Sequence, residues 1–132
     1  MSEPRLHAYL SYQDAPAALD WLGALGFTVS ARQDGPDGSV VHSEVRLGDV
    51  VLMVASADAD YDVPGLHGRS TGNGLYLRVD DVDDMFDRAV SAGAQVVIDP
   101  ESTEWGTRRA RVLDPEGHEW SFGSYAPGQA WQ

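Results

Sequence analysis

The stretch LHAYLSYQDAPAALDWLGALGF, Leu6–Phe27, decides the fold, because it contains the signals of a strand followed by a helix. The aromatic and long apolar residues of its first third favour a half-buried strand over 6–12. Asp14 can accept a backbone hydrogen bond as a helix N-cap, and Pro16 suits the first helical turn. Apolar residues at helical spacing follow, and Gly26 is typical of a left-handed helix end. The stretch therefore predicts a strand, a tight corner and a helix.

The same plan returns in YLRVDDVDDMFDRAVSAGAQVV, which begins at Tyr76. A shift of 67 residues (76 − 9) places Tyr9 on Tyr76. The same shift places Gly26 on Gly93 and aligns the two expected capping aspartates. Since a cap, a core position and a helix stop rarely align together by chance, we infer two copies of one strand–helix module.

Short apolar runs separated by turn residues predict three more strands after each helix. We expect them at 27–31, 39–47 and 50–55, and again at 95–98, 109–113 and 119–124, with a polar loop over 99–108. Each module therefore has the order βαβββ, and the fold class is α+β. We expect one domain, 1–132, with module one at about 4–57, a linker at about 58–72, module two at about 73–125 and a loose tail at 126–132.

Composition and charge limit the functions that this chain can have. The formal net charge of −12 repels nucleic acid and anionic lipid, so neither is an expected partner. The same charge either serves solubility or suits a cationic ligand. The absence of cysteine excludes disulfides and thiolate chemistry. No apolar run is long enough to span a membrane and no signal peptide precedes the first strand, so we expect a cytoplasmic protein.

The βαβββ–βαβββ order resembles the vicinal oxygen chelate superfamily, which contains glyoxalase I, extradiol dioxygenases, fosfomycin-resistance enzymes and bleomycin-resistance proteins. The resemblance extends from Leu6 to Tyr125 and includes LGF at 25–27, WGTR at 105–108 and DPEGHEWSFG at 114–123. The last two motifs are similar to those of glyoxalase-like proteins. The resemblance implies that each module curls its sheet into a cup and that the two cups surround a ligand cavity.

Metal enzymes of this family carry one ligand on each of four strands. The resemblance places these four ligands at His7, Met53, Gly74 and Ser121. Glycine offers no ligand atom, and a thioether suits copper(I) and not the divalent metals of the family. Because a lone imidazole does not hold a divalent cation tightly, we expect no metal cofactor at these places. A displaced divalent-metal site is the alternative, and it would use His42, Glu44 or His118.

Strand alternation predicts which side chains face the cup and which form the core. The polar side of strand 39–47 either faces the cup as well or faces bulk water, and Trp105 is either a cavity lid or a loop anchor. The candidate ligand-binding residues are His7, Tyr9, His42, Glu44, Met53, Tyr76, Arg78, Trp105 and Ser121. Aromatic rings and a soft methionine with a few ionisable groups suit a flat organic molecule.

The opposite parity predicts the core. We expect Leu10, Leu52, Val54, Leu77, Trp120 and Phe122 to pack under the helices. In strand 39–47, Val41, Val45 and Leu47 should share one face. Trp21 lies on the less apolar side of its helix, which predicts a place at a subunit contact.

The sequence leads to a metal-independent small-molecule-binding protein similar to bleomycin-resistance proteins. It would sequester an organic ligand, cationic and aromatic, in a role in antibiotic resistance. The alternative is a glyoxalase-like lyase or isomerase that uses His7 with Glu44 or Glu119, or a displaced metal site. In the first interpretation His7 only lines the cavity. A scaffold domain that uses no pocket is a third possibility. We expect a homodimer, since cups often pair between chains in this family and open sheet edges need protection.

Overall fold

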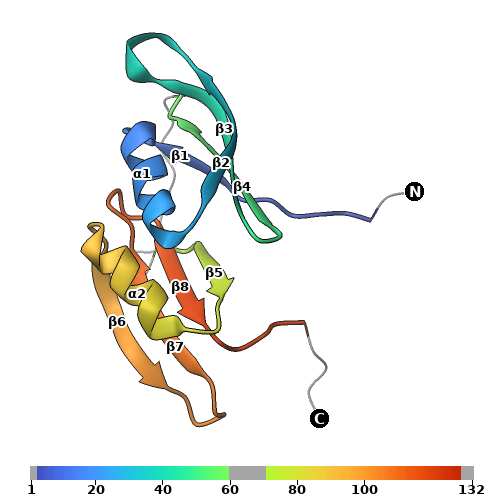
Figure 1. Cartoon of the computed structure of the whole chain (residues 1–132), viewed down its shortest axis with the longest axis vertical. Helices are drawn as coiled ribbons and strands as arrows, with labels where there is room; N and C mark the ends of the chain where they lie inside the picture. Colours follow the sequence, from blue (N-terminus) through green and yellow to red (C-terminus); the bar gives the residue numbers. More distant parts are fainter. Residues whose placement is uncertain (1–2, 60–70, 129–132) are drawn as a thin grey trace. The chain divides into compact units, whose positions relative to one another are not determined.

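The computed structural model describes residues 3–59 and 71–128. The chain divides into two compact units, whose described parts are residues 3–59 and 71–128 (Figure 1). Within the described residues each unit contains one α-helix and one four-stranded mixed sheet. The predicted α+β class with two βαβββ modules is therefore confirmed. None of the described helices is long and apolar enough to cross a membrane.

The first unit begins with a strand and a helix, as the sequence predicts. Its elements are β1 (Tyr9–Tyr12), α1 (Ala15–Leu25), β2 (Thr28–Asp34), the 3₁₀ turn η1 (Pro36–Gly38), β3 (Val40–Leu47) and β4 (Val50–Ser56). The strand order is β1-β4-β3-β2. β1 runs parallel to β4, whereas the other neighbours are antiparallel. The chain therefore crosses from α1 to the far edge of the sheet and then returns to β1 by hairpins.

The second unit repeats this plan. Its elements are β5 (Gly74–Arg78), α2 (Val82–Ser91), β6 (Gln95–Ser102), β7 (Arg108–Leu113) and β8 (Glu119–Gly123), in the order β5-β8-β7-β6. The predicted loop over 99–108 is too long, because β6 continues to Ser102 and β7 already begins at Arg108. The polar stretch 99–108, which contains Pro100, predicted a loop where the strand in fact continues. β6 tolerates this proline because it is an edge strand and its register shifts between Ile98 and Glu101.

The predicted helix N-caps are confirmed in both units, and the predicted glycine stop is the C-cap of α1, whereas Ala92 is the C-cap of α2. The Asp14 carboxylate accepts a hydrogen bond from the Ala17 backbone at 3.0 Å, and Asp81 accepts one from Asp84 at 3.0 Å. Each cap satisfies a backbone donor that has no partner inside the helix. Gly26 ends α1 with a φ of 112°, a conformation that strains any residue with a Cβ.

The predicted core is also confirmed. All six expected residues are buried, namely Leu10, Leu52, Val54, Leu77, Trp120 and Phe122. The expectation for Trp21 was wrong, because this side chain is only 3% exposed within the chain. Ala18, Trp21, Leu22 and Leu25 form a single i, i+3, i+4, i+7 stripe that α1 buries. Trp21 therefore belongs to the core and gives no support for a subunit contact.

A β-bulge overturns the expectation for Val41. This side chain is 54% exposed, whereas its neighbour Val40 is buried. The register moves from Gln33 opposite His42 to Asp34 opposite Val40, so β3 contains one extra residue at this point. Because a bulge reverses the alternation of a strand, Val40 replaces Val41 on the core side.

Asp114 organises the turn that joins β7 to β8. Its carboxylate is almost fully buried and accepts hydrogen bonds from the backbone N–H groups of Glu116 and His118, both at 3.0 Å. It also accepts one from the Trp120 indole at 3.3 Å. The DPEGHEW motif is therefore structural at these positions, since a single carboxylate holds both the turn and the core tryptophan.

Candidate ligand-binding site

In the first unit, three predicted site residues form one row across the open face of the sheet, the face opposite the core side chains. Tyr9 of β1 pairs with Met53 of β4, and Met53 pairs with Glu44 of β3. Directly paired residues project from the same face of a sheet, so these side chains are neighbours. We call Tyr9, Met53 and Glu44 the module-one row. Tyr9 is 52% exposed, which leaves its ring accessible.

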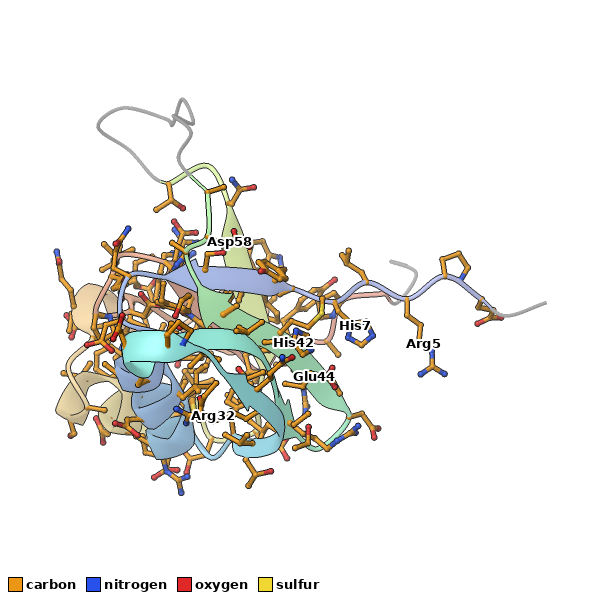
Figure 2. All side chains as sticks on the ribbon, turned by 90° about the horizontal axis from the view of Figure 1, so that it is seen from above. Arg5, His7, Arg32, His42, Glu44 and Asp58 are labelled. Atoms are coloured by element: carbon orange, nitrogen blue, oxygen red, sulfur yellow. The ribbon has the colours of Figure 1, made fainter. Side chains whose placement is uncertain are left out.

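His42 extends the module-one row. Its Nε2 donates to the Glu44 carboxylate at 2.8 Å, and both side chains are about 40% exposed. They lie two residues apart on β3 and therefore on the same face of the strand. Figure 2 shows the two side chains next to each other on this strand. The polar side of β3 thus carries an imidazole oriented by a carboxylate.

His7 is placed differently from the other predicted site residues. It lies in the extended segment before β1, where its Nδ1 is 3.0 Å from the backbone oxygen of Val51 (Figure 2). Because a carbonyl only accepts, Nδ1 carries the proton and Nε2 of the neutral ring is an acceptor. No hydrogen bond or ion pair joins His7 to Glu44 or Glu119 in the described part of the chain.

The second unit has an equivalent row. Tyr76 of β5 pairs with Ser121 of β8, and Ser121 pairs with Arg111 of β7. The Arg111 Nε donates to the Ser121 hydroxyl at 2.9 Å. We call Tyr76, Ser121 and Arg111 the module-two row. The sequence analysis missed Arg111, although the repeat shift of 67 (111 − 44) leads from Glu44 to this position.

Two glycines accommodate large side chains on the open face of the second sheet. A Cβ added at Gly74 would lie 2.5 Å from the Glu119 carboxylate, so this carboxylate lies over the glycine. A Cβ added at Gly123 would collide with the Tyr76 ring, which occupies that space. The Tyr76 hydroxyl then donates to the Tyr125 backbone oxygen at 2.7 Å. Burial raises the pKa of the Tyr76 phenol, against the lowering effects of the Arg78 charge and of this hydrogen bond.

Two further predicted site residues lie at the margins of the second sheet. Arg78 at the end of β5 forms an ion pair with Asp80 at 2.7 Å. Trp105 is 78% exposed in the loop between β6 and β7. A hydrogen bond of 2.7 Å between the hydroxyls of Thr103 and Thr107 closes this loop. The Trp105 ring is therefore presented to the surroundings, and the two threonines hold the loop.

A shallow hollow of about 280 Å³ lies beyond the C-terminal ends of β1 and β4. It is lined by Gln13, Ala57, Asp58 and Ala59, of which Asp58 is labelled in Figure 2. Its lining is mostly polar and contains none of the predicted site residues. In the described residues, no three His, Asp or Glu side chains are grouped as they would be to hold a metal ion.

Comparisons with known proteins identify the relatives of this chain. An uncharacterised protein of Mycobacterium bovis is 36% identical over 131 residues, which covers 92% of this chain and 83% of that protein. The crystal structure of TioX from Micromonospora sp. ML1 is 31% identical with a TM-score of 0.71, and covers 92% of this chain and 100% of TioX. A bleomycin-binding protein complexed with bleomycin has the same fold, with a TM-score of 0.63 and 23% identity over 94% of this chain and 100% of that one.

The family model matches almost the entire described chain. Residues 5–122 fit the model of the glyoxalase/bleomycin resistance protein/dioxygenase superfamily. The duplicated βαβββ topology and the DPEGHEW turn agree with this match. This chain therefore belongs to the glyoxalase/bleomycin resistance protein/dioxygenase superfamily, as its resemblance to the vicinal oxygen chelate proteins predicts.

Proposed function

We propose that this protein binds a small organic ligand with a cationic, aromatic part, and sequesters it without chemical change. The observation that carries the proposal is the module-one row, which combines an exposed tyrosine ring, a methionine and a carboxylate on adjacent strands. Apolar area supplies affinity in such sites, and a few polar groups orient the ligand. The relationship to bleomycin-binding proteins supports this class of function, and a role in antibiotic resistance is part of the proposal.

The chemistry of the row favours a cation. The Tyr9 ring offers a negative face to a cationic or aromatic group, and Met53 adapts its shape to flat ligands. Glu44 supplies a carboxylate that is half exposed and therefore accessible to a ligand amine or amidine. The net charge of −12 adds a long-range attraction that increases the rate of association with cations.

We propose further that binding needs no metal ion. Among the four positions that carry metal ligands in enzymes of the family, Gly74 has no donor atom and Met53 presents a thioether. The Glu119 carboxylate lies over Gly74, so a side chain there would have to displace it. The donor set at these places does not fit a divalent metal, and we assign no role to one.

The test is a binding experiment with benzamidine and bleomycin as probes. Glu44→Gln should weaken benzamidine binding roughly tenfold, because it removes a charge-assisted hydrogen bond. Glu116→Gln, which changes an exposed glutamate of the second unit, is the matched control and should bind as the parent does. Calorimetry gives the affinities, and mass spectrometry shows whether the probe is recovered unchanged. Equal affinities for the two variants, or conversion of either probe, would contradict the proposal.

The His42–Glu44 pair favours a second candidate, an acid–base lyase or isomerase. A carboxylate at 2.8 Å orients the imidazole, as in many general acid–base pairs. Here the partner of Glu44 is His42 and not His7, the histidine that the sequence predicts for this pair. Turnover of a carbonyl probe that His42→Gln abolishes would favour this candidate over sequestration.

We also propose that the protein is a homodimer. The edge strand β2 is exposed along its whole length, and an open edge favours pairing or protection by another chain. Native mass spectrometry at micromolar concentration should give twice the chain mass of 14.3 kDa. A monomer at this concentration would contradict the proposal without affecting the ligand-binding function.

A further inference from the structure

Most arginines that the structure describes form short ion pairs with carboxylates, and Arg111 is a partly buried exception. The sequence has 21 acidic and nine basic residues, so acids are in excess. In the described part of the chain, five arginines lie within 3.0 Å of a carboxylate oxygen, namely Arg32, Arg78, Arg88, Arg108 and Arg109. Arg5 and Arg46 have no such partner, but both are exposed at the end of a segment or strand.

Arg111 differs from these residues. Its guanidinium Nε donates to the Ser121 hydroxyl at 2.9 Å, whereas the nearest carboxylate oxygen, on Glu119, is 3.9 Å away. Its side chain is 36% exposed, on β7 at one end of the module-two row. Because acidic residues are in excess, most arginines can form a short ion pair with a carboxylate of this chain. An arginine whose close partner is a neutral hydroxyl is therefore a candidate for binding the anionic group of a ligand.

The geometry leaves the guanidinium available. A guanidinium is planar and rigid, so the bond from Nε to Ser121 fixes the plane in which its two terminal nitrogens donate. Neither terminal nitrogen of Arg111 has a hydrogen bond to any residue that the structure describes. Its fork of donors matches the two oxygens of a carboxylate.

Two large side chains near Ser121 lie over glycines of the same sheet. The Glu119 carboxylate lies over Gly74, and the Tyr76 ring extends over Gly123. In each case the larger side chain occupies the space that a Cβ at the glycine would fill. Tyr76 is also the direct partner of Ser121 on the neighbouring strand, so an aromatic residue belongs to the same row as the guanidinium.

We propose that Arg111, oriented by Ser121 and in the same row as Tyr76, is a subsite for an oxyanion of an aromatic ligand, most simply a planar carboxylate. This inference deepens the proposed function. The module-one row offers a carboxylate to cations, whereas the module-two row offers a guanidinium to anions. The two subsites bind opposite charges and are tested separately below.

Three probes with one aromatic ring and different charges test the subsite: benzoate, benzamide and benzamidine. In the parent protein, benzoate should shift the Arg111 Nε–Hε NMR resonance and benzamide should not, because only benzoate carries the charge. Arg111→Gln should lower benzoate affinity at least about tenfold. Arg109→Gln is the matched control, because this neighbour on β7 is already paired with Glu101 and should leave benzoate binding unchanged. Phenyl phosphate in place of benzoate shows whether the subsite prefers a tetrahedral oxyanion.

Glu119→Gln provides a test in the opposite direction. Its carboxylate lies near the guanidinium and repels an incoming anion, so its neutralisation should strengthen benzoate binding roughly threefold. Equal benzoate affinity for the parent and Arg111→Gln would overturn the subsite, as would an unmoved Arg111 resonance at saturating benzoate. In that case a benzamidine affinity that falls in Glu44→Gln would still support the proposed cation site. Conversely, if Glu44→Gln left benzamidine affinity unchanged while benzoate still bound at Arg111, only the cation site would be contradicted.

Discussion

The Asp114 carboxylate combines burial and three hydrogen bonds in one residue. Asp114→Ala removes the acceptor for two partly buried backbone N–H groups and for the buried Trp120 indole. We expect a loss of about 2–4 kcal/mol in the free energy of unfolding. Urea unfolding followed by tryptophan fluorescence measures it. Glu116→Ala, on the exposed neighbour in the same turn, is the control and should change stability by less than about 0.5 kcal/mol. A similar small effect for Asp114→Ala would contradict this account.

The ion pair between Arg108 and Asp83 predicts a stability that depends on pH. The Arg108 guanidinium lies 2.6 and 2.8 Å from the two carboxylate oxygens, and it holds the pKa of Asp83 below its ordinary value of 3.8. A lowered folded-state pKa stabilises the fold above 3.8, and the effect is lost as the pH falls through the lowered pKa. Arg108→Gln should therefore shift the urea midpoint at pH 7 and at pH 5 equally, and less at pH 3.

A double-mutant cycle provides the control for this pair. Asp83→Asn should reproduce the destabilisation at pH 7, and the double variant should be no less stable than either single variant. Strictly additive effects at pH 7, or a difference that grows as the pH falls, would show that the pair does not act in this way.

The sequence predicts which face of a strand a side chain occupies better than it predicts the hydrogen bonds of that side chain. Parity places His42 and Glu44 on one face, but the hydrogen bond between them depends on side-chain rotamers that no pattern specifies. The repeat shift of 67 residues leads from Glu44 to Arg111. The two side chains have opposite charges, so a comparison of residue types does not show that the positions are equivalent. The role of Ser121 in orienting Arg111 follows only from the sheet register.

Among the elements, β5 and β8 depend on a glycine for their side-chain packing. Gly123→Ala places a methyl group in the space of the Tyr76 ring and should break the hydrogen bond from Tyr76 to Tyr125. We expect a destabilisation of about 1–3 kcal/mol. The pKa of the Tyr76 phenol should fall toward its ordinary value, since burial is the main cause that raises it. Thermal unfolding and an ultraviolet pH titration measure the two effects.

Gly23→Ala is a matched control for this substitution. Gly23 lies in α1, and a Cβ added there meets nothing within 4 Å. Because alanine is the better helix former, Gly23→Ala should stabilise the protein by about 0.5–1 kcal/mol. If Gly123→Ala were equally harmless, the Tyr76 ring would not need the space over this glycine.

The helices and most strands of both units could be predicted because their signals are local. A capping aspartate, a helical apolar stripe and a glycine stop lie within one short stretch, and all three hold in the structure. The bulge at Val41 was not predictable, because it arises from the pairing of β3 with β2 and not from β3 itself. The extension of β6 through Pro100 has the same cause, since only the sheet order reveals that β6 is an edge.

For the whole molecule, the donor set predicts an indifference to divalent metals. Addition of Mn²⁺, Zn²⁺ or Ni²⁺ should leave the thermal unfolding midpoint within about 1 °C of its value in Mg²⁺, because a specific site would stabilise the folded state by mass action. Differential scanning fluorimetry measures the midpoint, and elemental analysis of the purified protein checks for a retained metal. A midpoint that rises by several degrees and saturates at one equivalent of metal would overturn the prediction.

The carboxylate that lies over Gly74 also affects what another side chain at this position would meet. A histidine there would contact the Glu119 side chain, so this flexible carboxylate would have to turn away before an imidazole could take its place. A shorter side chain at position 119 would remove the contact. The space for a donor atom at position 74 is therefore set by the residue at position 119.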